Sequence, residues 1–385
     1  KLKNVTFEEG SCLQEIDSNA FYGAGMENFV MPENVRYVGD GALGGCLSLR
    51  SVTLSKNVSV VTYGEANIFQ GCTALENIFV QAGSQYFTSV DGVLYDLGMT
   101  ILYCYPIAKD SANLQLPDTL ITIETGAFYG FRGNNIVLPD SLETIGNSAF
   151  KESNLSSIHI PKNVISIGEY AFCIEGELAP LDGNMISLES LSFAPDSKLE
   201  SIGNYAFYGQ TKLKKVILPD NVTTVGMFAF TYCESLEEVV LPAALKNLER
   251  GVFTNTPNLK TFIMQEGLET IGMNALAGAT NAPNNALTQL DIPATVTSIG
   301  NYAFHGCSNL QWAVIGTGVT SVGSRTFGNC TSMQYIEFKG NAPAIGSNAF
   351  YYCQNLKEVE LPSGITGIGM YAFRDCPNLT EISIP

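Results

Sequence analysis

Apolar positions recur along the chain in short units, and residues 213–233 form a clean copy of the unit. Leu213, Val216 and Leu218 change to a spacing of two at the end of the run, which predicts a short strand. Pro219 has no amide hydrogen, so it ends the hydrogen-bonded ladder of that strand. The first half of the unit is therefore predicted to be a strand followed by a turn.

The second half of the unit is predicted to bend and to insert an aromatic ring into the core. Gly226 permits the bend, and the Met-Phe-Ala-Phe stretch at 227–230 predicts a single helical or 3₁₀ turn that buries Phe230. One such unit cannot bury its own apolar edges. Copies must therefore stack on both sides of it, as in a solenoid.

The copies are found through a Gly-x-x-Ala-Phe motif, and Phe207, Phe230 and Phe253 follow one another at intervals of 23 residues. The aromatic residue of this motif, or a Leu in its place, is the anchor of each copy. The anchors are Phe21, Leu43, Phe69, Phe128, Phe150, Phe172, Phe207, Phe230, Phe253, Leu276, Phe304, Phe327, Phe350 and Phe373. Ten of these fourteen anchors have a glycine four positions earlier, which chance does not produce in a chain with 37 glycines among 385 residues.

The full pattern, Leu-x-x-Val-x-Leu-Pro-x-x-Val-x-x-Ile-Gly-x-x-Ala-Phe-x-x-Cys-x-x-Leu, resembles the leucine-rich repeats of BspA-like proteins and covers nearly the whole chain. The resemblance and the period together predict an α/β repeat, a right-handed leucine-rich-repeat solenoid of about fifteen coils with a concave β-sheet. Residues 1–385 are expected to form a single leucine-rich-repeat domain. Both ends stop without a polar cap, so we expect a fragment of a longer protein.

Three segments depart from the regular unit. Residues 86–106 resemble a hairpin-like variant unit of the same family and account for most of a long interval between anchors. Two insertions, Ile174–Met185 and Gly278–Asn285, each follow an anchor. Loops inserted between repeats are either padding or binding elements, and the sequence leaves both interpretations open.

The charge balance excludes some partners. The chain has 20 Lys and Arg against 37 Asp and Glu, a net charge of −17, which disfavours nucleic acid and anionic membrane surfaces. Its apolar fraction of 45% and charged fraction of 15% suit a large core. The sequence has no apolar run long enough to span a membrane.

Seven of the ten cysteines lie three residues after an anchor and should form a column through the stacked units; they are Cys46, Cys72, Cys233, Cys307, Cys330, Cys353 and Cys376. Buried free thiols in a small core slot are the favoured interpretation, with disulfide pairing and metal binding as alternatives. No Cys-x-x-Cys occurs. Of the two histidines, His305 is expected at a surface turn and His159 on the face of a strand. We predict no metal site, no cofactor and no catalytic residue.

The outward positions of the predicted strands are expected to line the concave face of the solenoid, through which a ligand would bind, and they supply the candidate ligand-binding residues. Ile217, Val240 and Ile263 form an apolar strip. Trp312, the single tryptophan, comes two coils later beside Tyr335. An acidic cluster of Glu337, Glu358 and Glu360 follows these two aromatic residues. Aromatic and aliphatic side chains rimmed by acids are typical of protein-binding surfaces, although β-branched residues also simply suit a sheet.

The resemblance implies a non-enzymatic binding or adhesion module at a cell surface or in the extracellular medium. Its implied partners are host extracellular-matrix or surface proteins, or other microbial surface molecules. The alternative is a structural stalk that displays another domain. An enzyme is a distant third class, because no histidine or carboxylate pair here supports a specific reaction.

Overall fold

The computed structural model describes residues 2–63, 66–175, 187–278, 286–340 and 344–385. It divides into two compact units, an N-terminal unit of Lys1–Ile186 and a C-terminal unit of Ser187–Pro385. The described residues form a β-solenoid of about 14 turns, close to the fifteen predicted, and contain no helix. The single domain and the right-handed sense stay predictions.

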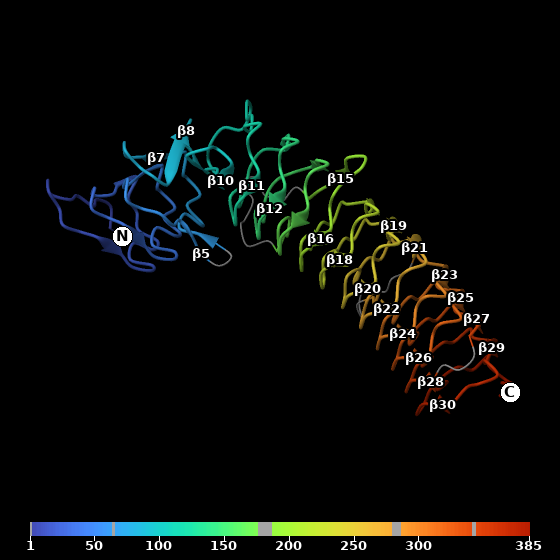
Figure 1. Cartoon of the computed structure of the whole chain (residues 1–385). Helices are drawn as coiled ribbons and strands as arrows, with labels where there is room; N and C mark the ends of the chain where they lie inside the picture. The colour runs from blue at the N-terminus through green and yellow to red at the C-terminus, as the bar shows by residue number, and fades with distance from the viewer. Residues whose placement is uncertain (1, 64–65, 176–186, 279–285, 341–343) are drawn as a thin grey trace. The chain divides into compact units, whose positions relative to one another are not determined.

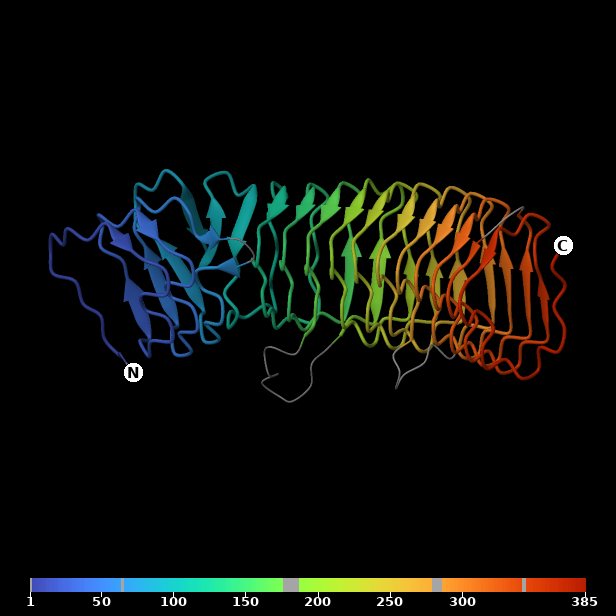
Figure 2. The same cartoon turned by 90° about the horizontal axis from the view of Figure 1, so that it is seen from below.

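Most coils carry a long strand and a short strand, and equivalent strands of successive coils form rows (Figures 1 and 2). In the C-terminal unit the long strands are β15 (Ser190–Phe193), β17 (Lys215–Ile217), β19 (Glu238–Val240), β21 (Thr261–Ile263), β23 (Gln289–Ile292), β25 (Trp312–Ile315), β27 (Tyr335–Phe338) and β29 (Glu358–Glu360). The short strands are β16 (Ser201–Ile202), β18 (Thr224–Val225), β20 (Asn247–Leu248), β22 (Thr270–Ile271), β24 (Ser298–Ile299), β26 (Ser321–Val322), β28 (Ala344–Ile345) and β30 (Gly367–Ile368).

The N-terminal unit repeats this plan with more irregular coils. Its long strands are β2 (Asn28–Val30), β4 (Ser51–Leu54), β7 (Asn77–Val80) and β13 (Ser157–Ile160). Its short strands are β1 (Glu15–Ile16), β3 (Tyr37–Val38), β11 (Thr122–Ile123), β12 (Thr144–Ile145) and β14 (Ser166–Ile167). The pairs β5 (Thr62–Tyr63) with β6 (Ala66–Asn67), and β8 (Phe87–Val90) with β9 (Val93–Asp96), are antiparallel.

The segment 86–106, for which a hairpin-like variant was predicted, contains three strands. β8, β9 and β10 (Ile101–Cys104) form an antiparallel meander, and β10 then pairs in parallel with β11. Val90 faces Val93 across a two-residue turn in which Asp91 and Gly92 both have positive φ, 48° and 72°. Asp-Gly suits such a turn because both of its central residues need φ above zero. The segment thus replaces a regular coil with a folded-back sheet.

The core is built from columns of equivalent side chains. Phe230 is fully buried and stacks on Phe207 and Phe253, with ring centroids 5.1 and 5.4 Å apart and nearly parallel planes. In the N-terminal unit Phe150 stacks in the same way between its neighbours, at 4.9 and 5.1 Å. Burying one such side chain stabilises the fold by about 1.5–3 kcal/mol, so the anchor column is a main source of stability.

The predicted helical turn at 227–230 is wrong. Ala229 N–H donates to Gly226 O at 3.3 Å and Thr231 N–H donates to Phe228 O at 3.2 Å, so this stretch is a pair of successive tight turns. Phe228 between them has φ of 58°, in the left-handed region, which interrupts any right-handed helical run. The α part of the predicted α/β class therefore does not hold for the described residues.

The left-handed residue is itself a column. It directly precedes the Ala of the motif in coil after coil, at Asn19, Ser148, Tyr170, Tyr205, Phe228, Asn274, Tyr302, Asn348 and Tyr371. Contacts between coils hold it in place. Phe228 N–H donates to Arg250 O at 3.0 Å, and its ring stacks on Tyr205 with centroids 5.1 Å apart.

The role assigned to Gly226 is also different from the prediction. Its φ is not positive, and a Cβ on it would lie 2.5 Å from Asn204 N and 2.6 Å from Gly203 C in the preceding coil. A Cβ on Gly346 would likewise lie 2.5 Å from Gly323 C, in the backbone of the preceding coil. The glycine column therefore permits the close approach of neighbouring coils.

Within the C-terminal unit the short strands β20–β30 follow the inner side of the bend and the long strands β19–β29 follow its outer side (Figure 1). The prediction that the long strands line a concave face is therefore wrong for this unit. The bend of a solenoid comes from the small rotation between coils, which the apolar pattern of one coil does not specify.

Candidate functional site

One four-stranded parallel sheet brings together five of the predicted site residues. In the order β23, β25, β27, β29, Trp312 pairs with Tyr335, and Tyr335 pairs with Glu358. Two residues further along the strands, Glu337 pairs with Glu360. Residues between them, such as Ala313 and Ile336, are fully buried, so the alternation along each strand turns the site residues outward. We call these five residues the tryptophan face.

The two aromatic residues of the tryptophan face are presented to solvent to different degrees. Trp312 is 47% exposed, whereas Tyr335 is half-buried. The pKa of Tyr335 is raised to about 12 by burial, by a hydrogen bond with Glu360 and by the nearby charges of Glu337 and Glu358. The phenol therefore keeps its proton at neutral pH, and its hydrogen bond links Tyr335 to Glu360.

The three carboxylates of the face are not neutralised by ion pairs. No ion pair within the described residues includes Glu337, Glu358 or Glu360, whereas Glu238 on β19 pairs with Lys215 at 2.9 Å. Unpaired carboxylates on adjacent strands create a local negative potential that attracts a basic partner.

The apolar strip lies on another sheet. Ile217, Val240 and Ile263 are consecutive partners in the parallel sheet β17–β19–β21. Ile217 and Ile263 are 47% and 42% exposed, and Val240 is half-buried. No ladder joins β21 to β23 among the described residues. The predicted residues therefore form two separate surfaces.

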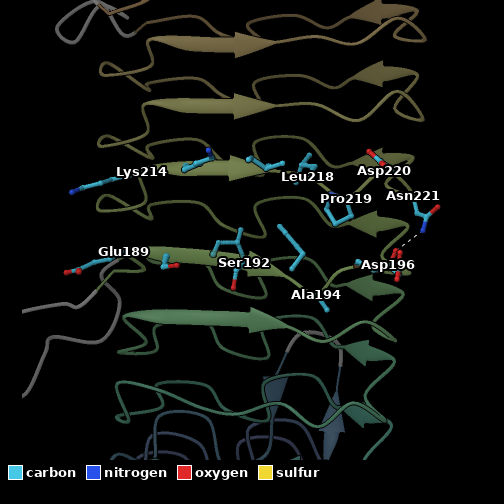
Figure 3. Close-up of a pocket in the computed structure, with 15 residues that line it drawn as sticks. Glu189, Ser192, Ala194, Asp196, Lys214, Leu218, Pro219, Asp220 and Asn221 are labelled. Carbon is cyan, nitrogen blue, oxygen red and sulfur yellow. Dashed lines mark hydrogen bonds between the residues drawn. The ribbon is translucent and has the colours of Figure 1, made fainter.

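A cleft between β15 and β17 was missed by the sequence reasoning (Figure 3). It measures about 730 Å³, and Ile217 lies on its wall. These two strands come from successive coils but do not pair. A signal was available in the sequence, because the outward positions of β15 are the small residues Ser190 and Ser192, where the next coil carries Lys215 and Ile217.

The cysteine column has a structural role in the coil stack. Each of its seven thiols donates to a carbonyl group of the preceding coil, as Cys330 Sγ does to Phe304 O at 3.3 Å and Cys353 Sγ to Phe327 O at 3.2 Å. Burial raises the pKa of the Cys307 thiol to about 12. No disulfide joins any of the ten cysteines, and the part of the chain that the structure describes contains no cluster of metal-ligating side chains.

The two histidines lie in different surroundings. His159 lies exposed on β13, as predicted. His305 is half-buried rather than on the surface, with its ring 5.4 Å from that of Tyr302 and Nε2 at 3.3 Å from Asn329 Nδ2. Burial, together with the charge of Arg325, lowers the pKa of His305.

Stacked coils with a Leu-x-x-Val-x-Leu strand and a buried phenylalanine anchor define a leucine-rich-repeat solenoid. The model of the BspA type leucine-rich repeat region matches residues 1–90, 103–182, 183–284 and 283–385. The chain therefore belongs to the BspA-type leucine-rich repeat family. Proteins of this kind are generally protein-binding or surface modules without enzymatic activity.

Solved structures of other proteins are similar to this chain. A leucine-rich repeat protein from Bacteroides ovatus ATCC 8483 is 23% identical over 95% of this chain and 81% of its own, with a TM-score of 0.52. A leucine rich cell surface protein from Faecalibacterium prausnitzii A2-165 is 19% identical over 99% of this chain and 85% of its own, with a TM-score of 0.42. No curated protein matches the chain. Among the described residues, no helix is long and apolar enough to cross a membrane.

Proposed function

We propose that this chain is a non-enzymatic binding module that recognises a protein partner through the tryptophan face. One observation carries the proposal. A tryptophan that is 47% exposed lies on a single sheet beside Tyr335 and three carboxylates for which no ion pair is found among the described residues. Tryptophan and tyrosine are the residues most enriched at the energetic centres of protein interfaces.

The chemistry of the face indicates the kind of partner. The indole and phenol rings offer apolar area, and Glu337, Glu358 and Glu360 favour a surface rich in Lys or Arg. Ile217, Val240 and Ile263 provide a second apolar area, on β17–β19–β21, for a partner that extends along the coils. Binding should weaken as salt is added, because exposed charges are screened.

Family membership supports a place at the cell surface or in the extracellular medium, where the partners would be host extracellular-matrix or surface proteins, or other microbial surface molecules. An array of matrix proteins and glycans tests this part of the proposal. A binding module retains at least one ligand on the array, whereas a structural stalk retains none.

The site itself is tested with the double variant Trp312→Ala/Tyr335→Ala. Loss of two interface aromatics should weaken binding to a partner found on the array by about 30-fold or more, since single hot-spot residues contribute about 2 kcal/mol. Met370→Ala is the control, because Met370 is 65% exposed on a turn of the same unit. Unchanged binding by a folded double variant would remove the tryptophan face from the proposal.

A further inference from the structure

The hairpin of β8 and β9 lies at the edge of β7, which is the last strand of the sheet β2–β4–β7. Ile78 N–H donates to Gly92 O at 2.9 Å, and Ser89 Oγ donates to Ile78 O. These two hydrogen bonds fix the hairpin to the middle of β7, and Figure 1 shows β8 next to β7. The hairpin thus takes the place of the long strand with which a regular coil would continue the sheet.

A cleft of about 450 Å³ lies between β7 and this hairpin. Asn77 and Phe79 line it from β7, where they alternate with the buried Ile78 and therefore point outward from the sheet. Thr88 of β8 and Leu97 of the loop between β9 and β10 line it from the other side. The volume is within the range of pockets that hold a small ligand. The departure from the regular repeat therefore creates a binding-sized cleft.

The cleft offers little charge to a ligand, although the chain as a whole is acidic. Among the described residues that line it, only Asp91 is charged, and its carboxylate pairs with Lys109 at 3.3 Å. Lys56, which lies beside the cleft residue Gly83, pairs with Glu33. The carboxylate of Asp96, at the end of β9, accepts hydrogen bonds from the loop that follows it. An ionic ligand would therefore find no unpaired charge to attract it.

The groups that the cleft does offer are an aromatic ring and uncharged polar side chains. Phe79 is 46% exposed. Within the described part of the chain, no hydrogen bond occupies the side-chain amide of Asn77 or the hydroxyl of Thr88. A pyranose sugar has the matching chemistry, because the C–H groups on one face of its ring pack on an aromatic ring while its hydroxyl groups bond to amides and hydroxyls. A purely apolar side chain of a protein would instead leave Asn77 and Thr88 without partners.

We propose that the cleft between β7 and the β8–β9 hairpin binds a neutral saccharide. One pyranose ring packs on the ring of Phe79, and its hydroxyl groups bond to Asn77 and Thr88. The site belongs to the N-terminal unit and uses no residue of the tryptophan face. It therefore stands whether or not that face binds a protein.

Fluorescently labelled linear hexasaccharides of glucose, mannose, galactose and N-acetylglucosamine are the probes, with the full chain as receptor. Hexagalacturonate is the charged comparison. At least one neutral probe should bind at least about ten-fold more tightly than hexagalacturonate in fluorescence polarisation, because a chain with a net charge of −17 repels a polyanion. Binding of none of the four neutral probes, or binding of hexagalacturonate as tight as that of the best neutral probe, would overturn the proposal.

Two variants of Phe79 separate stacking on the ring from simple apolar contact. Phe79→Tyr keeps the ring and should bind the best hexasaccharide within about three-fold of the wild type, whereas Phe79→Leu keeps only an apolar side chain and should bind at least about ten-fold more weakly. Val30→Ala is the control, because Val30 is the third residue of β2 as Phe79 is the third residue of β7. Equal affinities of the two Phe79 variants would contradict stacking on this ring.

The polar contacts are tested in the same assay. Asn77→Ala and Thr88→Ala should each weaken binding by about three-fold or more, because each removes a hydrogen-bonding partner of the sugar. Asn28→Ala, at the first position of β2 that matches Asn77 in β7, should leave the affinity unchanged. Wild-type affinity in both Asn77→Ala and Thr88→Ala would count against the proposed site. Trp312→Ala/Tyr335→Ala should bind the saccharide normally, so failure of the cleft and failure of the tryptophan face are distinguishable.

Discussion

Replacing Gly226 by alanine tests the close approach of successive coils. The new Cβ would lie 2.5 Å from Asn204 N and 2.6 Å from Gly203 C, both backbone atoms of the preceding coil. Favourable contacts between carbon atoms begin at about 3.5 Å, so the added methyl is about 1 Å too close. Gly226 N–H donates to Ile202 O at 2.8 Å, which fixes the two coils at this spacing.

Overpacking of this kind destabilises by about 1–3 kcal/mol, and backbone neighbours place Gly226→Ala toward the upper end. Alanine also lowers the conformational entropy of the unfolded chain, which stabilises the folded protein by about 0.4–1 kcal/mol. The net loss of about 1–2 kcal/mol corresponds to a fall in Tm of about 2–8 °C for a unit of this size.

Calorimetry of the full chain measures the effect, and Gly367→Ala is the matched control. A Cβ on Gly367 meets no atom within 4 Å and its φ is not positive, so this variant should be slightly stabilised. A Tm of Gly226→Ala equal to or above that of the wild type would refute the reasoning.

Three further predictions concern the other columns of the stack. Asn348 has φ of 56°, so Asn348→Val should destabilise by about 1–2 kcal/mol while Asn348→Gly should be neutral or stabilising; equal urea midpoints for the two variants would contradict a left-handed requirement. Phe327 is fully buried and stacks on Phe304 and Phe350, with ring centroids 5.4 and 5.6 Å apart. Phe327→Ala should therefore lower the free energy of unfolding by about 3–5 kcal/mol. A loss below about 1 kcal/mol, measured by urea unfolding, would argue against a stabilising phenylalanine column. Burial raises the pKa of Cys307 and of Cys104 to about 12, whereas thiols of the unfolded chain titrate near pH 8.5. The native state therefore keeps protons that the unfolded state loses, so this stabilisation is complete below about pH 8.5 and is lost as the pH rises toward 12. The Tm measured from pH 8 to 11 should fall less steeply for Cys307→Ala than for the wild type, and identical slopes would exclude this thiol as a cause.

The strands, the anchor column and the hairpin could be predicted from the sequence because each has a local signal. The spacing of Leu213, Val216 and Leu218 marks a strand, and Asp91-Gly92 marks the turn of the hairpin. The outward position of Trp312 and Tyr335 followed from the same alternation. These features depend on residues that are close together in the sequence of one repeat.

The incorrect predictions concern features that depend on contacts between successive coils. Propensity rules do not place a bulky residue such as Phe228 in the left-handed region, where Arg250 O and the Tyr205 ring hold it. The side toward which the coils bend and the missing ladder between β15 and β17 also arise only after stacking. Gln210 is an example. Nothing in the sequence around this residue indicates that its side-chain amide oxygen accepts a hydrogen bond from Leu188 N–H of the preceding coil.

The central claim is that a partner covers Trp312. Since the chain contains a single tryptophan, its emission under tryptophan-selective excitation reports on this side chain alone when the partner, or the fragment of it that is used, has no tryptophan. Titration with a partner from the array should shift the emission of Trp312 to shorter wavelength, with the same midpoint as an independent binding curve, because an indole that is 47% exposed loses water on contact. Saturable binding of the partner with no change in this emission would contradict the claim.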